Sequence, residues 1–420
     1  MQLCIFEDSN CLNFEPIVYS RPVYDLICGI NTLRQKILRS YPKVKYTLHC
    51  RPYIAPVVKL HNPGVVVNSF EDTAYLFING SVIAPVGMKK IIPLKHEEDV
   101  VYMNGNRVIA AYVSGNNLQK LKSKLNEPID NLFFSGLPVK QVKINYASYL
   151  WDLINLNGEE IKNDFCYLQQ NLKDKKIIGK VHTGAYILGK KNIIIEKDAV
   201  IKPGAVIDAT QGSVYIGKNS VVYPNAVIEG PVFIGKNSQI KSGANIHNNV
   251  SICDTCRIGG EVEDSIFLAY SNKQHDGFIG HAYIGSWVNL GAGTNCSNLK
   301  NNYGNVRAYV NGSLVNSGSQ FLGLIMGDHS KSAINTMFNT GTNAGFFSNI
   351  FGAGFPDIFI PSFSWGGSQQ MTTYDAGKAI DVAKIVMARR NKQMHTIEEN
   401  LIKTIFELTK AERRKRGYPD

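Results

Sequence analysis

The sequence predicts a two-part protein, in which an α/β region precedes a parallel β-helix that ends in helices. Three observations carry this prediction: a six-residue hydrophobic period that begins at Ile195, its absence from residues 1–150, and a helical hydrophobic spacing after Tyr374. At 420 residues the chain is long enough for two domains with separate cores.

Composition narrows the class of protein. The chain has 44% hydrophobic and 19% charged residues, as an ordinary globular protein does. It lacks an apolar run of about 18 residues, and it opens into Leu3–Phe6 without the charged segment of a signal peptide. Eight scattered cysteines suit a reducing compartment, so we expect a cytoplasmic protein without membrane insertion. The net charge of +11 suits anionic substrates, and no nucleic-acid partner is expected, because no basic stripe is interleaved with aromatic residues.

Residues 1–150 contain short β-rich runs that alternate with polar or helical stretches, which indicates an α/β domain. Strands are expected at Leu3–Phe6, Lys45–Leu48, Tyr75–Ile78, Lys89–Ile92 and Val108–Tyr112. Residues 151–180 are expected to form a helical connector to the repeat region.

From Ile195, apolar residues recur at every sixth position, and a small residue follows most of them four positions later. After one slip of three residues the series runs through Ile195, Ile201, Ile207, Ile216, Val222, Ile228, Ile234, Ile240, Ile246, Ile252 and Ile258. This repeat is typical of a parallel β-helix, in which each inward side chain stacks on that of the next coil. The β-helix is predicted over residues 181–367, with a weaker register from Met326 and two interruptions, near 262–283 and 297–322.

The pair Cys253 and Cys256 lies inside this series. Cys256 occupies one of the small positions, and no second cysteine or histidine pair follows at the spacing of a zinc site. We therefore expect no metal site here.

Residues 368–420 are expected to form C-terminal helices that cover one end of the β-helix or contact a neighbouring subunit. Ala379, Val382, Ala383, Val386 and Met387 recur at three- and four-residue spacing. Thr396 and Glu399 form a capping box for a second helix.

The first interruption contains the polar segment 272–277 with His275. Histidine titrates near neutral pH, so on a loop that projects from a rigid scaffold it is suited to accept the proton of an attacking amine during acyl transfer. The alternative is an exposed loop histidine without a chemical role. The coil that follows, 284–294, returns to the period and would hold Asn289 beside this loop.

These residues resemble a known family. His275, Phe278, Ile279-Gly280, Ile284-Gly285 and the run Val-Asn-Leu-Gly-Ala-Gly-Thr at 288–294, followed by Asn298, are similar to the acetyltransferase half of bifunctional UDP-N-acetylglucosamine pyrophosphorylase/glucosamine-1-phosphate N-acetyltransferase. The whole chain is more similar to a divergent branch of sugar nucleotidyltransferase/acetyltransferase fusions, through stretches such as SRPVYDLICGINTLRQK (20–36), FINGSVI (77–83) and FLGLIMGDHSK (321–331).

The resemblance implies a nucleotidyltransferase-like N-terminal domain, a left-handed β-helix and a homotrimer with active sites between subunits. It implies that His275 is the catalytic base, that Phe278 and Asn289 contact the sugar, and that Ala292 and Asn298 lie along the acetyl-CoA site. The family's tyrosine is replaced here by Phe278. The family's lysine for the sugar phosphate has no counterpart, because residues 258–272 contain no basic side chain. Its candidate replacements are Lys241, Arg257, Lys273 and Arg307, so the acceptor need not be glucosamine 1-phosphate.

The N-terminal region departs further from the family. The Gly-rich phosphate loop is missing, because the first glycine of the chain is Gly29. The segment Asn79-Gly80-Ser81 stands where a Gly-Asp magnesium ligand is expected. Arg21, Asp25, Arg34 and Lys36 are candidates for a different nucleotide site, and Mg²⁺ would be needed only if this domain is active.

Three hypotheses follow. The first is an enzyme of nucleotide-sugar biosynthesis that transfers acetyl from acetyl-CoA to an amino sugar phosphate. The second is a bifunctional enzyme that also performs nucleotidyl transfer from UTP or another NTP. The third is a non-catalytic trimeric scaffold. The polar segment around His275 argues against the scaffold, because a β-helix has no structural need for it.

Overall fold

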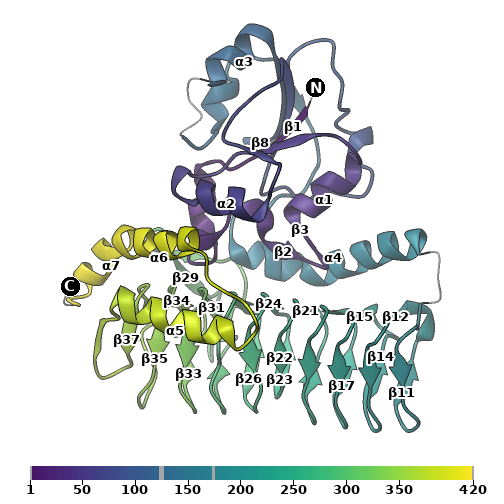
Figure 1. The fold of residues 1–420 in the computed structure, drawn as a ribbon, viewed down its shortest axis with the longest axis vertical. Helices are drawn as coiled ribbons and strands as arrows, with labels where there is room; N and C mark the ends of the chain where they lie inside the picture. The colour runs from purple at the N-terminus through teal and green to yellow at the C-terminus, as the bar shows by residue number, and fades with distance from the viewer. Residues whose placement is uncertain (1, 123–126, 173–175, 419–420) are drawn as a thin grey trace.

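The computed structural model describes residues 2–122, 127–172 and 176–418. The predicted ranges 1–150, 151–180 and 368–420 include residues 1, 123–126, 173–175 and 419–420, which lie outside this described part. Figure 1 shows an N-terminal α/β domain above a row of coiled strands, with the C-terminal helices at one end of that row. No helix within the described ranges is both long and apolar enough to cross a membrane.

The N-terminal domain is built on a sheet of seven described strands, in the order β5-β4-β1-β6-β8-β7-β9. Their bounds are β1 Gln2–Phe6, β4 Tyr46–Leu48, β5 Val66–Val67, β6 Ala74–Asn79, β7 Val100–Asn104, β8 Arg107–Ser114 and β9 Val139–Gln141. Strand β1 is parallel to β4 and β6, and β8 is antiparallel to β6 and β7. The strand expected at Lys89–Ile92 is wrong, because this segment forms the 3-10 helix Met88–Lys90 after the left-handed turn at Gly87.

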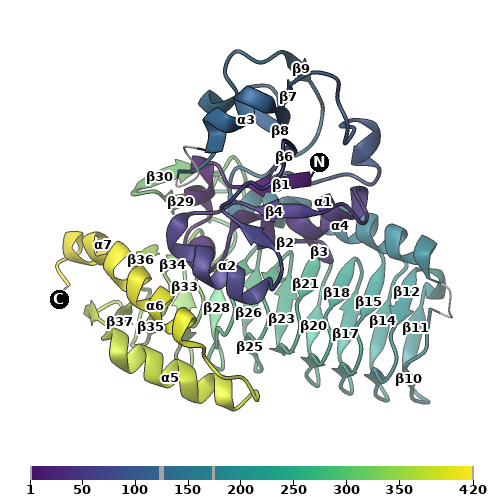
Figure 2. The ribbon, with the colours of Figure 1, turned by 45° about the horizontal axis from the view of Figure 1, so that its top comes forward.

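Helices and turns surround this sheet. They are α1 Leu33–Ser40, α2 Ala55–His61 and α3 Gly115–Lys122, with the hairpin β2 Ile27–Cys28 and β3 Asn31–Thr32. Helix α1 starts at a capping box, in which Thr32 Oγ1 accepts from Gln35 N and the Gln35 side chain accepts from Thr32 N. The long helix α4, Leu150–Asn171, then leads to the repeats and lies along them, as Figures 1 and 2 show.

The repeats form a parallel β-helix with three sheets. The upper sheet faces α4 and contains β12 Ile193–Ile195, β15 Val214–Ile216, β18 Val232–Ile234, β21 Val250–Ile252, β24 Ile266–Phe267, β27 Tyr283–Ile284, β31 Ile325–Met326, β34 Asn343–Ala344 and β36 Phe359–Ile360. The α5-side sheet contains β10 Lys180–Val181, β13 Val200–Ile201, β16 Val221–Val222, β19 Gln239–Ile240, β22 Arg257–Ile258 and β25 Asn272–Lys273, then β32 Lys331–Ser332, β35 Asn349–Ile350, β37 Ser364–Gly366 and the antiparallel β38 Met371–Thr373.

The third sheet contains β11 Tyr186–Leu188, β14 Val206–Asp208, β17 Val227–Glu229, β20 Asn245–Ile246, β23 Glu261–Glu263 and β26 Phe278–Gly280, and the pair β28 Asn295–Cys296 and β33 Met337–Phe338 follows. The predicted apolar series points inward and is fully buried. The fold class is confirmed: an α/β domain, a β-helix of the left-handed hexapeptide class, and C-terminal helices.

The first predicted interruption is wrong. Ile240 pairs with Ile258 on the next coil, in step with the period. Ile258 pairs with Lys273 on the following coil, and fewer residues separate these two than a full coil contains. Residues 262–283 therefore form a shortened coil with strands on all three sheets, and no loop carries His275 away from the ladder. The second interruption is confirmed, because Ile284 pairs with Met326 across an insertion that holds the hairpin β29 Arg307–Val310 and β30 Ser313–Asn316.

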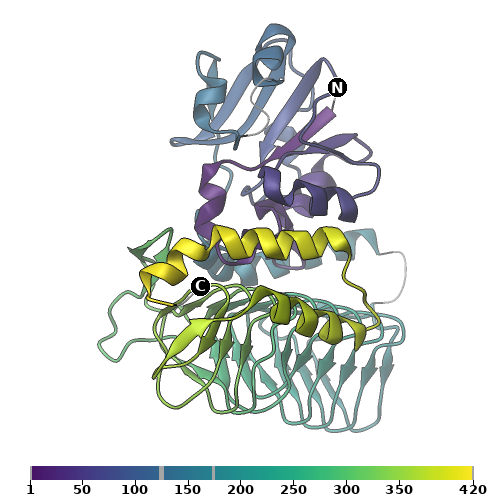
Figure 3. The ribbon, with the colours of Figure 1, turned by 60° about the vertical axis from the view of Figure 1, so that its left-hand side comes forward.

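The C-terminal helices are α5 Ala376–Ala388, α6 Thr396–Leu408 and α7 Lys410–Lys415. The capping box of α6 consists of His395 and Glu398, which corrects its prediction at Thr396 and Glu399. Figure 3 shows α6 between the N-terminal domain and the β-helix, with α5 beside the coils.

A shared apolar core joins the three parts of the chain. It contains Leu76 of the N-terminal sheet, Phe347 and Phe363 of the last coils, and Ile380 and Leu401 of the C-terminal helices. The three parts therefore pack as one body.

Candidate active site

His275 lies at the corner between the α5-side sheet and the third sheet, immediately after β25, and its side chain is exposed. The same corner of the next two coils is formed by Ala292 and by Ile334. Backbone hydrogen bonds fix this stack, from Gly293 N to Asp276 O at 3.0 Å and from Asn335 N to Ala292 O at 2.7 Å. The structure thus brings His275 and Ala292 together on successive rungs of one exposed edge.

Two glycines permit this close stacking. Gly277 has a φ of +117°, and a Cβ on it would lie 2.1 Å from Thr294 O. Gly293 has a φ of +68°, and a Cβ there would lie 2.2 Å from Asn335 Oδ1. A Cβ on Gly277 would meet backbone, and Gly293 has a left-handed φ that disfavours other residues, so both glycines have a structural role in this stacking.

Phe278 and Asn298 come together on the third sheet. Phe278 Cζ and Asn298 Nδ2 both lie 2.6 Å from the point where a Cβ on Gly280 would stand. Asn298 Nδ2 is already engaged, at 2.9 Å from Glu263 Oε1 and 3.0 Å from His281 Nδ1. His281 stacks on Phe321, and burial lowers the pKa of its imidazole. Its partners and burial suit a packing role for His281, whereas the exposed His275 has free access to a ligand.

Lys273, predicted to bind substrate, has its side chain buried inside the β-helix, which does not support that role. It occupies the ladder position above Ile258, so its side chain points into the coil and is 1% exposed. Its Nζ donates to Gly259 O at 2.9 Å and to His275 O at 3.0 Å. Burial lowers the pKa of this amine to about 8. Lys273 therefore holds the turn that presents His275, from inside the β-helix.

Asn289 is exposed on the α5-side sheet, bridged between Asn272 and Lys331 of the neighbouring rungs. It stands three residues before Ala292, so it lies roughly 10 Å along the strand from the corner that carries His275. Asn289 lines a cavity of about 300 Å³ between this sheet and the end of α5. Four cationic side chains line the same cavity: Arg257, Lys331, Arg389 and Arg390.

Arg257 is the one candidate for the missing sugar-phosphate lysine that lines this cavity. Lys241 lies over the ring of Tyr223, at 4.7 Å from its centroid. Arg307 is exposed on the inserted hairpin, where its Nη2 donates to Leu314 O. The structure therefore separates these candidates into different surfaces.

The four candidate nucleotide residues are all engaged within the protein. Arg21 forms an ion pair with the buried Asp328 of the β-helix, and Arg34 Nε lies 2.8 Å from Asp25 Oδ1. Burial raises the pKa of Asp25 to about 6, and the Arg34 charge opposes that rise. The prediction that Arg21, Asp25 and Arg34 form a nucleotide site is not supported, because each charge is already paired.

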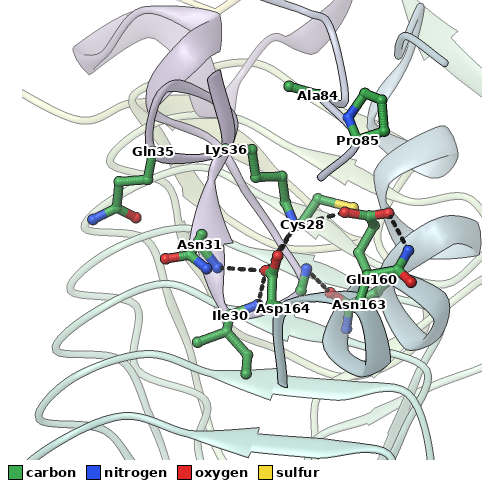
Figure 4. Close-up of polar contacts among 12 residues, drawn as sticks. Cys28, Ile30, Asn31, Gln35, Lys36, Ala84, Pro85, Glu160, Asn163 and Asp164 are labelled. Carbon is green, nitrogen blue, oxygen red and sulfur yellow. Dashed lines mark hydrogen bonds and ion pairs between the residues drawn. The ribbon is translucent and has the colours of Figure 1, made fainter. Parts of the chain in front are cut away.

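Lys36 is fully buried, which also corrects its prediction as a nucleotide contact. Its Nζ lies 2.6 Å from Glu160 Oε2 and 2.6 Å from Asp164 Oδ2, both on α4. Figure 4 shows that Asp164 also accepts from the backbone N–H groups of Ile30 and Asn31, at 2.9 and 3.1 Å. This cluster fixes the N-terminal domain to α4.

The carboxyl ends of β1 and β6 are closed by their own side chains. Asp8 Oδ2 accepts from Asn79 Nδ2 at 2.8 Å, and Asp8 Oδ1 accepts from Arg107 Nη2 at 3.2 Å. The guanidinium of Arg107 thus pairs with the carboxylate next to Asn79, and at 79–81 the side chains are an amide and a hydroxyl with no carboxylate. Over the ranges that the structure describes, no group of three or more His, Cys, Asp or Glu side chains is arranged to hold a metal. The donor set at this edge does not fit a magnesium ion.

The sequence reasoning missed Lys331, Arg389 and Arg390. The insertion after Ile284 separates Lys331 from Asn289 in the sequence, although the two residues lie on neighbouring rungs, and the two arginines come from beyond the β-helix. The adjacent pair Arg389-Arg390 directly after an amphipathic helix was the available signal.

Comparison with known proteins adds two findings. Residues 3–173 match the family model described as sugar nucleotidyl transferase. The chain is 32% identical over 204 residues to a bifunctional sugar-1-phosphate nucleotidylyltransferase/acetyltransferase of Sulfurisphaera tokodaii, which covers 48% of this chain and 43% of that protein. It is 25% identical to the bifunctional protein GlmU of Wigglesworthia glossinidia brevipalpis, over 56% of this chain and 50% of that one. It is also 25% identical to GlmU of Methanocaldococcus jannaschii, over 67% and 71%.

The first two alignments thus span about half the length of each relative. The predicted resemblance to bifunctional nucleotidyltransferase/acetyltransferase proteins is confirmed.

Proposed function

We propose that this chain, which is similar to bifunctional sugar-1-phosphate nucleotidylyltransferase/acetyltransferases, transfers acetyl from acetyl-CoA to an amino sugar phosphate or nucleotide-linked amino sugar. His275 is the general base. Phe278, Asn289 and Arg307 are proposed sugar contacts, and Ala292 and Asn298 are proposed acetyl-CoA contacts. The observation that supports this best is the exposed corner on which His275, Ala292 and Ile334 stack.

The chemistry needs a base at such an edge. The amine attacks the carbonyl carbon of the thioester, the C–N bond forms, and the C–S bond breaks as the CoA thiolate leaves. His275 takes the proton that the amine loses, and this proton then passes to the thiolate. Backbone hydrogen bonds and Lys273 fix the turn that carries His275, so the backbone position of the base is set before the substrates bind.

The corner carries apolar groups that solvent contacts in a single chain. Ile334 is 70% exposed and Phe351 is 40% exposed. A homotrimer, in which a neighbouring subunit covers this edge, would bury them and complete a groove for the acyl donor. We include this assembly in the proposal, together with a cytoplasmic location, which suits the eight free thiols.

The test is release of CoA thiol from acetyl-CoA, screened over amino sugar 1-phosphates and nucleotide-linked amino sugars. We expect His275→Ala to abolish turnover without changing the circular dichroism spectrum or oligomeric state. The matched control is His247→Ala on the same β-helix, where His247 pairs with Glu229 at 2.7 Å. Equal turnover by the His275→Ala variant and the native protein would show that the base is wrong.

A second candidate activity is nucleotidyl transfer, which the family match over residues 3–173 favours. It is tested by pyrophosphate release from UTP or dTTP with a sugar 1-phosphate and Mg²⁺. Because Asp8 is paired with Arg107 and Lys36 is buried, we expect no release. Pyrophosphate release above background would show that the N-terminal domain binds nucleotide even though Asp8 is paired and Lys36 is buried.

A further inference from the structure

The cavity beside Asn289 has walls from two distant parts of the chain. Arg257, Asn272, Asn289 and Lys331 come from successive rungs of the α5-side sheet, and Arg389 and Arg390 come from the end of α5. The stacked rings of Tyr270 and Trp287, with centroids 4.1 Å apart, also line it. Its volume is about 300 Å³.

The charges of this cavity are of one sign. Four of its ten lining residues are cationic and none is acidic. Arg390 is partly buried, and the nearby charges of Arg257 and Arg389 add to burial in lowering its pKa. Like charges that face one space repel each other, so this arrangement is unfavourable until an anion neutralises it.

Among the described residues, few protein acceptors face the donors in the cavity. Arg390 Nη2 donates to Asn272 Oδ1 at 3.0 Å, and Lys331 Nζ donates to His329 O at 3.1 Å. A guanidinium has five N–H donors and an ammonium three, so several remain for a ligand. Within the part of the chain that the structure describes, none of the four cations forms an ion pair with a carboxylate.

The sheet side of the cavity is rigid. Asn272, Asn289 and Lys331 are bridged one above the next, so their side chains project from rungs about 4.8 Å apart. A phosphate group matches several arginine and lysine donors at once, because its oxygens accept from a guanidinium in pairs and it carries up to two negative charges.

We infer that this cavity binds the phosphate group of a phosphoester ligand between the α5-side sheet and the end of α5. The inference deepens the proposed function and rests on it only for the class of ligand, since CoA, a nucleotide sugar and a sugar 1-phosphate all carry phosphoesters. The remaining volume then accommodates the sugar or nucleoside next to Tyr270 and Trp287.

The experiment is isothermal titration calorimetry of the full chain with four probes: CoA, UDP-N-acetylglucosamine, glucosamine 1-phosphate and inorganic phosphate. At least one phosphoester is expected to bind, and the probe that binds most tightly identifies the source of the phosphate. Arg257→Gln and Arg390→Gln are each expected to weaken its binding at least tenfold. Lys378→Gln, an exposed cation at the other end of α5, is the control and is expected to leave affinity unchanged.

Failure of the inference and failure of the proposed function give different results. Affinities within twofold of the native value in both arginine variants, or no binding of any phosphoester, would overturn the inference. Arginine-dependent binding that persists in His275→Ala supports the phosphate site whether or not acetyl transfer is detected. Acetyl transfer that the two arginine variants perform normally would support the proposed function and reject this site.

Discussion

Replacing Lys273 with methionine tests whether an amine is held inside the β-helix. In the native protein its Nζ is enclosed between Gly259 O and His275 O, at the ladder position above Ile258. Methionine has a similar length and no charge, so it fits a ladder of aliphatic side chains.

The magnitude follows from the pKa. Burial lowers the pKa of Lys273 from 10.5 to about 8, which corresponds to about 3 kcal/mol at ~1.4 kcal/mol per pH unit. Below pH 8 the lysine is charged in both states, and the folded state bears this full cost. Between pH 8 and 10.5 the unfolded chain keeps a proton that the folded chain has lost, so native stability rises with pH. Two lost hydrogen bonds cost the variant about 1 kcal/mol each.

At pH 7 the Lys273→Met variant is therefore expected to be as stable as the native protein or about 1 kcal/mol more stable. At pH 10 the native protein is expected to be more stable by about 1–2 kcal/mol. Urea unfolding followed by circular dichroism at both pH values measures the difference. Lys241→Met, whose side chain lies outside the coil over Tyr223, is the control. A stability difference for Lys273→Met that is the same at pH 7 and pH 10 would refute the reasoning.

Three further predictions concern other parts of the molecule. Lys36→Met removes the cation paired with Glu160 and one of the two cations paired with Asp164, which keeps only Arg39. In thermal unfolding it should lower the free energy of unfolding by about 3 kcal/mol, whereas Lys384→Ala, which breaks an exposed pair, should cost under about 1 kcal/mol. Gly277→Ala should destabilise the corner by about 2–3 kcal/mol and reduce acetyl transfer, because its Cβ meets Thr294 O, while Gly243→Ala, with open space around it, should cost about 1 kcal/mol. Phosphoester affinity should fall as pH rises through about 8, where Lys331 loses its proton. Three other cations, Arg257, Arg389 and Arg390, face the same cavity and stay charged at this pH. Calorimetry of the Lys331→Arg variant should therefore show an affinity that depends less on pH.

The β-helix was predictable because each inward position is read directly from the sequence. Ile240, Ile246, Ile252 and Ile258 are all fully buried, as the period requires. The apparent loss of phase after Ile258 came from two changes in one coil. The coil is shorter than its predecessor, and Lys273 takes a position that the period reserves for an apolar side chain. The pattern of hydrophobic residues alone does not distinguish a short coil that contains a buried lysine from a loop.

The candidate site was predictable only in part, because some of its residues are neighbours within the repeat and others are brought together only by tertiary packing. His275 and Ala292 stack because they occupy equivalent positions on adjacent coils, and the repeat itself indicates such neighbours. Arg390 reaches Asn272 from 118 residues away, through the packing of α5 on the sheet. The internal pairing of Lys36 likewise depends on α4 folding back onto α1, which no local pattern encodes.

At the shortened coil, the type of residue at one corner of the β-helix also changes. At the corner between the upper sheet and the α5-side sheet, one residue per coil has a positive φ: Asp198, Asn219, Asn237 and Thr255, and then Tyr270, Trp287, His329, Phe347 and Phe363. The first four are short polar residues, and three of them are of the kind that tolerates this backbone. The five that follow are large rings, and for Tyr270, Trp287, Phe347 and Phe363 this backbone is strained and persists only where packing compensates. Each ring stacks on the next along the corner, with Tyr270 and Trp287 centroids 4.1 Å apart and His329 and Phe347 centroids 4.5 Å apart.

The change from short polar residues to rings falls between Thr255 and Tyr270, within the shortened coil. Beyond it the corner is covered, since Phe347 and Phe363 share a core with Ile380 and Leu401. Burial lowers the pKa of His329 to about 3, so this histidine is neutral and packs as a ring. The shortened coil is therefore where an exposed solenoid becomes one that α5 and α6 cover. The cavity of Arg257 and Arg390 exists because that cover begins there, on the sheet next to the edge that presents His275.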